Sequence, residues 1–427
     1  MNRSIRVAAV QLLAHDRTDF ALRLDEIVAR VDDAARRADL LVLPEGTFPA
    51  YVLGAAPLDA VAVASALERL REVAVATRTV IVAGAAIAEG STLKNGAIAI
   101  DADGRIAGRA DKVFLWHFDR RWFSSGERIA PIETSLGTLG VLVCADGRLP
   151  TIAGALVDRG AVALVMPTAW VTSGRDPHAL ENVQADLLAR VRAYENGVPF
   201  IAANKCGAEL GMVAYCGKSQ IVDRHGEIVA IASEREAETL NASVELGASR
   251  PRRSARAGLS SRVPASAPPA RIAFSFEPLP DDVDERLVLL DDQYAVAPGD
   301  DERLAALGRA IPTAVVDDAV VLDPAALVSY RRAGYALICW TTEIGPPWSQ
   351  RLARARALEL RLYLIVFDRA AGRAFAVDPD GTVVAGTFDG YRLASFTFDP
   401  RKSAETAVAP GTDIGEGLER VEAVIAS

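Results

Sequence analysis

The sequence predicts a layered α/β fold with a mixed β-sheet, and three features of its pattern indicate this. Short apolar runs rich in β-branched residues alternate with longer amphipathic stretches, which is typical of strands alternating with helices. Two hairpin patterns, at residues 95–112 and 218–232, each contain an Asp-x-x-Gly turn. A third stretch, 136–170, contains two apolar strands joined by a helix. Hairpins beside crossover-connected strands favour a sheet that is neither all parallel nor all antiparallel.

The individual elements follow from hydrophobic period and from turn residues. Strands are expected at 5–13, 40–43, 80–86, 138–143, 161–166 and 198–204, and helices at 20–39, 58–78, 151–159 and 181–196.

Cys144 stands where the strand at 138–143 ends, and a turn at 145–147 follows it before the helix expected at 151–159. Folds of the α/β class place reactive groups at this position, because the strand end holds the side chain rigidly. Backbone N–H groups of the turn can there meet an oxyanion. A lone cysteine on a strand is otherwise a small packing residue, so its interpretation depends on the residues that accompany it.

Composition excludes several classes of function. The net charge of −9 argues against a nucleic-acid-binding surface. Four cysteines without paired spacing do not form a disulfide framework. The four histidines form neither an HxH nor an HExxH pattern, so we expect no metal site.

We expect a cytoplasmic protein without a membrane partner. The N-terminus enters a strand directly, with no apolar segment followed by a small-residue cleavage site. No apolar run reaches the roughly 18 residues that a membrane-spanning helix needs.

The chain divides into three parts. Residues 1–248 contain the α/β pattern described above, and residues 249–270, rich in Arg, Pro, Ser and Ala, predict a linker. Residues 271–427 predict a shortened α/β repeat of the first part. The similar pairs of segments are 6–15 with 271–280, 162–168 with 335–341, 188–205 with 352–369, and 221–231 with 376–386. Extending the second pair without a gap places Asp317 opposite Cys144, so the second copy is expected to be catalytically inactive.

Three reactive residues of the first part fall at strand ends. Glu45 follows LVLP, Lys112 follows the hairpin in GRADKVFLW, and Cys144 follows GVLV. Acyl transfer by a thiol requires a base, a donor of positive charge for the oxyanion, and an acid for the leaving amine. A glutamate, a lysine and a cysteine can supply these functions without a histidine.

These stretches resemble the nitrilase superfamily of carbon–nitrogen hydrolases. The similar segments are VAAVQ, LVLPEGTFPAY, NGAIAIDADGRIAGRADKVFL, GVLVCADGRLP, GAVALVMPTAW, VRAYENGVPFIAANK and GKSQIVDRHGEIVA, in the order of the family, over about residues 5–245. The resemblance implies a four-layer αββα sandwich for residues 1–248 and a Glu-Lys-Cys triad. It implies Glu45 as the general base, Lys112 as the oxyanion-stabilising cation, Cys144 as the nucleophile and the N–H of Ala145 as a second oxyanion donor. No cofactor is implied.

The resemblance also marks further positions and two departures. Tyr51 and Trp170 fall where the family often lines its pocket, and core packing is the alternative for both. Asp119 stands where many members have a second glutamate, so its shorter side chain leaves its reach to Lys112 open. The segment CADGRLP is more similar to the amidase branches than to true nitrilases.

The expected function is hydrolysis of a small amide or carbamoyl compound through a cysteine thioester. Two alternatives are a true nitrilase acting on C≡N, and a catalytically weak binding or scaffolding protein with the same fold. The second copy suggests a monomer with an internal pseudo-dimer, while a homo-oligomer is the other possibility.

Overall fold

The computed structural model describes residues 3–172, 178, 180–247, 266–277, 294–388 and 393–426. The chain forms two compact units. The first comprises Met1–Arg250, Ala409–Thr412 and Glu416–Ser427, and the second comprises Pro251–Val408 and Asp413–Gly415. Most of the linker expected at 249–270 lies outside the described residues.

The first unit contains two sheets. The larger has the order β11-β10-β1-β2-β3-β4-β5, with β14 also paired to β1, and the smaller has the order β13-β12-β9-β8-β7-β6. The strands of the larger sheet are β1 (Ser4–Leu13), β2 (Leu40–Val42), β3 (Val80–Glu89), β4 (Thr92–Ile100), β5 (Ile106–Asp111), β10 (Lys205–Glu209), β11 (Val213–Cys216) and β14 (Glu238–Glu245). Those of the smaller are β6 (Ile132–Thr134), β7 (Gly137–Val141), β8 (Ala163–Pro167), β9 (Phe200–Ala203), β12 (Gln220–Val222) and β13 (Ile228–Ile231).

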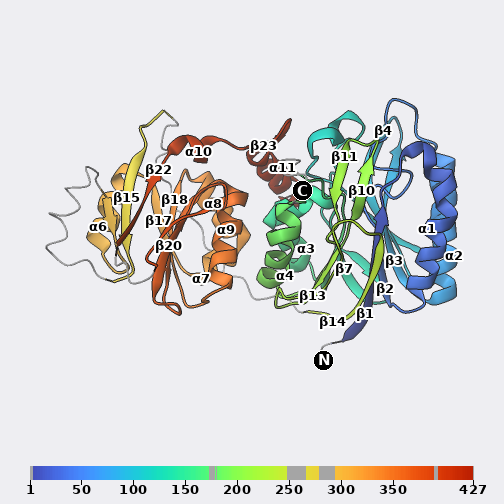
Figure 1. Ribbon diagram of the computed structural model, residues 1–427, viewed down its shortest axis with the longest axis horizontal. Coiled ribbons are helices and arrows are strands. Elements are labelled where there is room, and N and C mark those ends of the chain that lie inside the picture. The colour runs from blue at the N-terminus through green and yellow to red at the C-terminus, as the bar shows by residue number, and fades with distance from the viewer. Residues whose placement is uncertain are drawn as a thin grey trace. The chain divides into compact units, whose positions relative to one another are not determined.

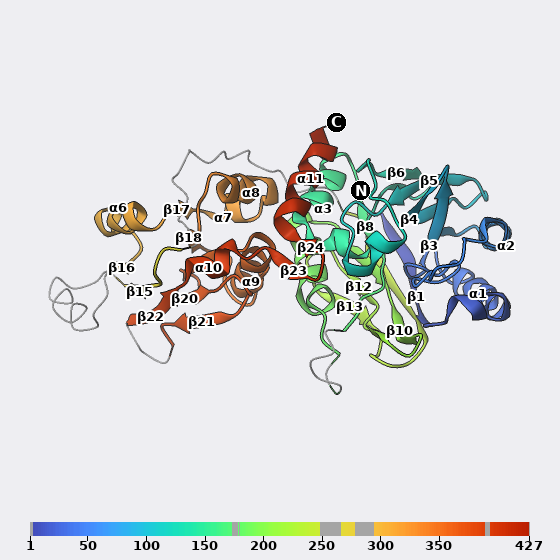
Figure 2. The same cartoon turned by 90° about the horizontal axis from the view of Figure 1, so that it is seen from above.

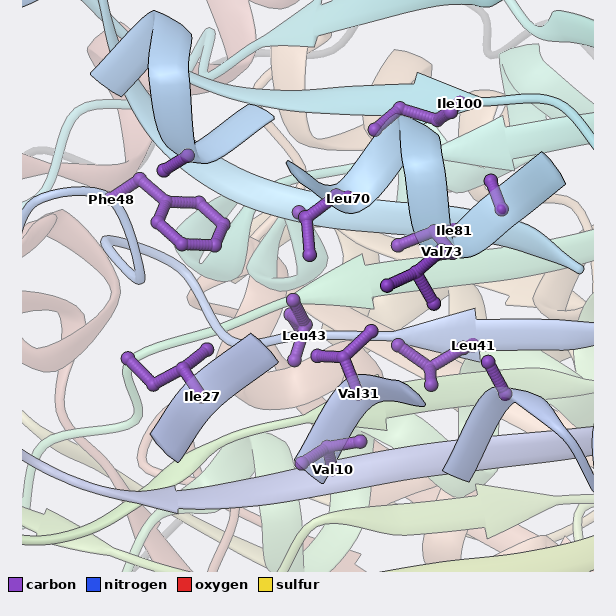
Figure 3. Close-up of a cluster of buried hydrophobic side chains, with 14 of the residues drawn as sticks. Val10, Ile27, Val31, Leu41, Leu43, Phe48, Leu70, Val73, Ile81 and Ile100 are labelled. Atoms are coloured by element: carbon purple, nitrogen blue, oxygen red, sulfur yellow. The ribbon is translucent and has the colours of Figure 1, made fainter. Parts of the chain in front are cut away.

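Two helices, α1 (Phe20–Ala35) and α2 (Ala60–Thr77), cover the outer face of the larger sheet. Their apolar faces and the outward-facing side chains of the strands form one buried cluster. Figure 3 shows this cluster, with side chains of both helices meeting those of four strands, among them Val10, Ile27, Val31, Leu41, Leu70, Val73, Ile81 and Ile100.

The helices α3 (Pro150–Asp158) and α4 (Ala189–Asn196) pack on the smaller sheet, whose other face contacts the larger sheet. The first unit is therefore the expected αββα sandwich, with helices outside and two sheets inside (Figure 1). Three short helices complete it: η1 (Arg17–Asp19), η2 (His117–Arg121) and η3 (Cys144–Arg148). A wide π-helical turn at Gln184–Leu188 leads into α4, where the sequence predicted a regular helix from residue 181.

Helix α1 ends four residues before the expected end at residue 39. Asp39 instead joins the edge of the sheet, because its carboxylate accepts a hydrogen bond from the Arg6 backbone N–H at 2.8 Å and also pairs with the Arg6 side chain. A side chain that satisfies a strand N–H in this way holds the backbone out of helical geometry.

The second unit is also an α/β structure with two sheets, in the orders β16-β15-β22 and β17-β18-β19-β20-β21. One apolar cluster joins side chains of both sheets. The strands are β15 (Ala270–Ser275), β16 (Tyr294–Val296), β17 (Thr313–Val316), β18 (Leu337–Thr342), β19 (Tyr363–Asp368), β20 (Arg373–Val377), β21 (Val383–Gly386) and β22 (Leu393–Phe398). The helices are α6 (Asp301–Ala310), α7 (Asp318–Val321), α8 (Pro324–Arg332), α9 (Trp348–Leu360) and α10 (Pro400–Ala404).

The strand directions in the second unit match those in the first. In the first unit β7, β8 and β9 are parallel and β12 and β13 follow antiparallel, and β17 to β21 repeat this pattern. Likewise β1 pairs antiparallel with β14 and parallel with β2, and β15 pairs antiparallel with β22 and parallel with β16. Strands corresponding to β3, β4 and β5 do not occur among the described residues of the second unit. That the unit is a degenerate copy stays a prediction.

The strand pairings give a register that differs by one residue from the gap-free sequence comparison. Across the sheets, Val141 pairs with Val165 and Val165 with Ile201, while Val315 pairs with Cys339 and Cys339 with Ile365. Cys144 lies three residues after Val141, and Asp318 lies three residues after Val315. The strand pairings therefore place Asp318 opposite Cys144, whereas the gap-free comparison placed Asp317 there. The gap-free comparison aligned β8 with β18. Because β8 and the first four residues of β18 are apolar and buried at every position, the sequence alone does not fix their register.

A buried arginine in each unit supports the same alignment of the two units. Arg192 Nε donates to the Gly147 carbonyl oxygen at 3.0 Å, and Arg356 Nε donates to the Val321 carbonyl oxygen at 2.9 Å. Gly147 and Val321 each lie three residues after the position compared above.

The end of the chain returns to the first unit, although the sequence boundary at residue 271 assigned it to the second domain. After β23 (Ala407–Ala409) and β24 (Thr412–Asp413), most of helix α11 (Ile414–Ala426) belongs to the first unit. The Arg159 side chain at the end of α3 donates to the Ile425 carbonyl oxygen at 3.0 Å, and both views show α11 beside α3 (Figures 1 and 2). In the described parts of the chain no helix is both long and apolar enough to cross a membrane.

Candidate active site

The turn that carries Cys144 has an unusual backbone conformation. Cys144 is the first residue of η3, three residues beyond the end of β7, and its φ is +45°. A positive φ is uncommon for a residue with a side chain and costs about 1–3 kcal/mol, so it persists only where the surrounding structure enforces it. Such outliers concentrate at functional sites, and a nucleophile on a sharp strand-to-helix turn is one known case.

The Cys144 thiol is buried beside charged groups. Burial raises the pKa of this thiol to about 12, the Glu45 carboxylate adds to the increase, and the Lys112 ammonium opposes it. The thiol is therefore protonated in the resting site at neutral pH, and a base must take its proton before it can attack.

Lys112 stands between two carboxylates. Its Nζ lies 2.8 Å from Glu45 Oε1 and 2.6 Å from Asp119 Oδ2, and all three side chains are fully buried. Burial lowers the pKa of Lys112, but the charges of Asp119 and Glu45 outweigh it and hold the pKa well above its ordinary value. Lys112 is therefore a fixed cation.

Glu45 is held by bonds that leave one oxygen available. Oε1 accepts hydrogen bonds from Lys112 Nζ and from Asn95 Nδ2, the latter at 2.7 Å, whereas Oε2 is buried and has no partner among the described residues. The Glu45 backbone N–H donates to the Thr168 carbonyl oxygen at 3.2 Å, which links the end of β2 to the end of β8 in the facing sheet. A buried carboxylate oxygen without a donor is placed to accept a proton.

The backbone at Glu45 depends on a close approach by β3. A Cβ at Gly84 would lie 2.4 Å from the Pro44 carbonyl oxygen and 2.5 Å from the Glu45 Cα. Only glycine permits this contact without a shift of the loop that carries the carboxylate.

Asp119, despite its shorter side chain, reaches Lys112. It lies in η2, and its Oδ2 also accepts a hydrogen bond from the Trp116 backbone N–H at 2.7 Å. Its Oδ1 is buried without a partner in the described structure, so it is an acceptor available to a ligand.

Two further predicted residues lie at the site. Tyr51 is buried with its ring centroid 5.9 Å from Lys112 Nζ, and burial together with the charges of Asp119 and Glu45 raises its pKa well above 10. Ala145 is the second residue of η3, where a backbone N–H has no acceptor within the helix. Tyr51 is thus a neutral hydroxyl beside the charged groups, and the N–H of Ala145 is free of intrahelical bonds.

No hydrogen bond in the described structure joins Trp170 to Glu45, Lys112 or Cys144. Its backbone N–H donates to Asn204 Oδ1 at 2.7 Å, and its carbonyl oxygen accepts from the Cys216 N–H. The indole is buried, and its Nε1 has no partner among the described residues.

Sequence reasoning missed Asp146, which joins the lysine loop to the cysteine turn. Its Oδ1 accepts hydrogen bonds from the backbone N–H groups of Val113 at 3.0 Å and Phe114 at 2.8 Å, and its Oδ2 accepts from Val143 at 3.2 Å. Burial raises the pKa of Asp146 to about 7, although these hydrogen bonds act against the increase. Its place two residues after the cysteine was the available signal.

A second missed pair holds the loop that follows Glu45. Lys205 Nζ lies 2.6 Å from Glu209 Oε1 and donates to the Gly46 carbonyl oxygen at 2.9 Å, while Glu209 Oε2 accepts from the Val52 N–H at 2.8 Å. Both charged side chains are buried. Lys205 and Glu209 are the two ends of the short strand β10, and nothing in the sequence of this strand indicated that their side chains are buried.

Within the part of the chain that the structure describes, no group of His, Cys, Asp and Glu side chains is placed to hold a metal ion. The other cysteines, Cys206, Cys216 and Cys339, are buried, and burial raises their pKa values to about 11, 12 and 12. That these three cysteines are unreactive packing residues stays a prediction.

Known proteins that are similar to this chain indicate its family. Residues 6–254, more than half of the chain, match a family described as carbon-nitrogen hydrolase. A probable nitrilase from Schizosaccharomyces pombe is 30% identical over 165 residues, covering 39% of this chain and 58% of that protein, so the match spans less than two thirds of its length. An (R)-stereoselective amidase from a Pseudomonas species is 28% identical over 239 residues, covering 54% of this chain and 82% of that protein.

A solved structure supports the fold. The crystal structure of a carbon-nitrogen hydrolase from Helicobacter pylori matches with a TM-score of 0.50 and 23% identity, covering 57% of this chain and 90% of that chain. The family match, the amidase and nitrilase relatives and the shared fold lead to one conclusion: this chain is an enzyme of the carbon-nitrogen hydrolase family.

Proposed function

We propose that the protein hydrolyses a small amide or carbamoyl compound through a thioester on Cys144. The Cys144 sulfur attacks the carbonyl carbon while Glu45 accepts the thiol proton, and the oxyanion is met by Lys112 Nζ and the N–H of Ala145. The C–N bond then breaks as Glu45 returns the proton to the leaving amine.

The second half of the cycle uses the same groups. Glu45 accepts a proton from water, and the hydroxide attacks the thioester carbonyl. The tetrahedral intermediate then collapses to the acid as the C–S bond breaks, and Glu45 returns its proton to the Cys144 thiolate. Atoms balance without a cofactor, because water supplies the hydroxyl group of the acid and one proton of the amine.

The observation that carries this proposal is the buried contact of Lys112 with both carboxylates beside Cys144. A glutamate with one occupied and one available oxygen can hold the lysine and still accept a proton. The protonated resting thiol requires such a base. A packing cysteine would need neither the fixed cation nor the strained turn.

The test is release of ammonia from a panel of short amides and carbamoyl compounds. The wild type is expected to release ammonia, the Cys144→Ala variant to release none, and mass spectrometry to find a transient acyl adduct on Cys144. The matched control is Cys216→Ala, another buried cysteine, which should retain turnover. Turnover by the Cys144→Ala variant, or loss of turnover in the control alone, would contradict the proposal. Faster release from nitriles than from amides would instead favour a true nitrilase.

A further inference from the structure

Thr168 lies opposite Cys144 at the ends of two paired strands. Strands β7 and β8 are parallel, and Val141 pairs with Val165. Cys144 follows three residues after Val141, and Thr168 follows at the same distance along the neighbouring strand. Because neighbouring strands are about 4.8 Å apart, the two residues lie next to each other at this end of the smaller sheet.

The Thr168 side chain is fully buried, and its hydroxyl has no hydrogen-bond partner among the described residues. Both backbone groups, by contrast, are bound. The N–H donates to the Ala203 carbonyl oxygen at 2.9 Å, and the carbonyl oxygen accepts from the Glu45 N–H at 3.2 Å. Thr168 is thus fixed between the two sheets with an unused hydroxyl, which is costly for a buried polar group unless the group has another role.

Two hydrogen-bond donors are placed to meet the Cys144 sulfur once it is charged. Burial and the Glu45 carboxylate raise the pKa of the Cys144 thiol. The Lys112 ammonium lowers it, and so do hydrogen bonds to the charged sulfur from the Thr168 hydroxyl and the Ala169 N–H. The hydroxyl without a partner in the resting site therefore gains an acceptor when the thiol loses its proton. An interaction that strengthens only as the nucleophile forms contributes to catalysis rather than to ground-state binding.

The second unit has the same backbone arrangement around a carboxylate. Asp318 and Thr342 stand in the corresponding positions, three residues beyond paired residues of β17 and β18. The N–H of Glu343, which follows Thr342, donates to Asp318 Oδ2 at 3.3 Å. The end of this strand therefore directs an N–H toward an anionic group on the neighbouring strand, as the N–H of Ala169 is directed toward Cys144.

The threonine hydroxyls of the two units differ in their partners. Thr342 Oγ1 accepts a hydrogen bond from the Ile344 N–H at 3.0 Å, and Asp318 Oδ1 accepts from the Trp340 indole N–H at 2.9 Å. The Thr168 hydroxyl has no such partner in the described structure. The unused hydroxyl is therefore found beside the cysteine and not beside the aspartate, which is the pattern expected if it serves the thiolate.

We infer that the Thr168 hydroxyl, together with the Ala169 N–H, donates a hydrogen bond to the Cys144 thiolate, which makes Thr168 a catalytic residue. This inference rests on the proposed function. Glu45 still takes the thiol proton and Thr168 keeps its own, so no step is added to the reaction. The same donors act again when the thioester breaks down, because the thiolate is then the leaving group.

The test compares Thr168→Val, which removes the hydroxyl at nearly constant volume, with Thr168→Ser, which keeps it. Loss of a hydrogen bond to a charged group should lower the fraction of thiolate about 10–100-fold. The more basic thiolate is a better nucleophile, which recovers part of this loss. We therefore expect kcat/KM of Thr168→Val to fall about 3–15-fold, mainly through kcat, because the hydroxyl contacts the sulfur and not the substrate. Thr168→Ser should keep most of the wild-type value.

Alkylation of Cys144 by iodoacetamide measures the thiolate without any amide substrate. The sulfur displaces iodide, and mass spectrometry of the modified protein at successive times gives the rate at pH 8. Thr168→Val should slow this reaction by about the same 3–15-fold, and Thr168→Ser should stay near the wild type. The matched control is Thr151→Val, since Thr151 is also buried with an unpartnered hydroxyl but lies in α3. The control should keep the wild-type turnover and alkylation rate.

Thermal unfolding checks that the variants are folded, and removal of an unpartnered buried hydroxyl should not cost stability. If Thr168→Val does not fold, Thr168→Ser and Thr168→Ala repeat the comparison, because they differ only in the hydroxyl. Equal rates in that pair would overturn the inference.

The remaining outcomes separate this inference from the proposed function. Wild-type rates in Thr168→Val, equal losses in the valine and serine variants, or slower turnover without slower alkylation each overturn the inference and leave the function standing. If no member of the amide panel releases ammonia, the proposed function fails for this panel, and alkylation alone decides the inference. Equal alkylation of Cys144 in the wild type and Thr168→Val, or none in either, then overturns it.

Discussion

At the scale of single residues, the site depends on charges that are buried together. Lys112 and its two carboxylate partners are fully buried, so each charge is tolerable only because the others are present. Asp146 is also buried, and its carboxyl group accepts hydrogen bonds from three buried backbone N–H groups that would otherwise lack acceptors. Both residues therefore contribute to stability as well as to the geometry of the reaction.

Replacing Lys112 with Met is expected to lower the free energy of unfolding by about 3–5 kcal/mol, because Glu45 and Asp119 are then buried as uncompensated like charges. Activity should be lost in the same variant. The measurement is urea unfolding at neutral pH, with Lys218→Met as the matched control. Lys218 is paired but partly exposed, so its loss should cost about 1 kcal/mol or less. Equal losses in the two variants would contradict the buried arrangement.

The raised pKa of Asp146 predicts that the free energy of unfolding depends on pH. Its folded-state pKa of about 7 lies above the ordinary value of 3.8, so the folded protein binds the extra proton between about pH 4 and pH 7. Stability from this group is therefore present at low pH and decreases as pH rises through 7. The destabilisation caused by Asp146→Asn should be larger at pH 5 than at pH 8.

Urea unfolding of the wild type and the Asp146→Asn variant at both pH values checks this prediction. Asp146→Ala serves as the comparison, because it leaves three buried N–H groups unsatisfied and should cost more than the asparagine at either pH, by about 1–3 kcal/mol. A penalty for Asp146→Asn that grows toward high pH would mean that the pKa is lowered rather than raised.

At the scale of elements, the ends of strands from the two facing sheets bring the reactive residues together. Glu45 follows β2 of the larger sheet and Cys144 follows β7 of the smaller one, while Lys112 ends the hairpin of β4 and β5. The backbone bond from Glu45 to Thr168 fixes the distance between the sheets at this point. Small changes in the packing of strands should therefore alter catalysis without a change in any reactive residue.

Gly84→Ala tests this dependence. The added Cβ would lie 2.4 Å from the Pro44 carbonyl oxygen and 2.5 Å from the Glu45 Cα. These backbone atoms cannot rotate away, so the loop must move. A displacement of about 1 Å can cost about 10²-fold in rate, and kcat is expected to fall by about that factor. Gly308→Ala is the control, since space is available there within helix α6 and alanine should be neutral or stabilising. Full activity of Gly84→Ala would refute the close contact.

At the scale of the whole molecule, the catalytic unit includes the end of the chain. Helix α11 buries Leu418 and Val421, and the Thr412 hydroxyl accepts a hydrogen bond from the His117 N–H in η2, the helix of Asp119. A Cβ at Gly417 would lie 2.4 Å from the Phe114 ring, two residues beyond Lys112. The last residues of the chain thus support the loop that carries Lys112 and Asp119.

We expect Val421→Asp in the full chain to destabilise the first unit and lower its activity, although Glu45, Lys112 and Cys144 are unchanged. The reason is that α11 is held by buried apolar contact, and an unpaired charge in that contact is costly. Thermal unfolding and ammonia release measure the two effects. Glu419→Gln, on the exposed face of the same helix, is the control. Wild-type stability and activity in Val421→Asp would show that the catalytic unit does not need the helix.

The sequence by itself determined the α/β class, the αββα sandwich through its resemblance to a family, and the order of Glu45, Lys112 and Cys144. These follow from hydrophobic period, turn residues and motifs, which are local properties of the chain. The sequence also found most strands to within a few residues, because apolar runs between Gly- and Asp-containing turns have few alternatives.

Only the tertiary structure decided the contacts between distant segments. Three such contacts are those of Asp119 with Lys112, of Asp146 with two loops, and of Arg148 with the Trp116 ring. These contacts, and the return of α11 to the first unit, depend on residues that are separated in the sequence. The one-residue difference between Asp317 and Asp318 has the same origin. A fully buried strand is apolar at every position, and only pairing with its neighbours fixes its register.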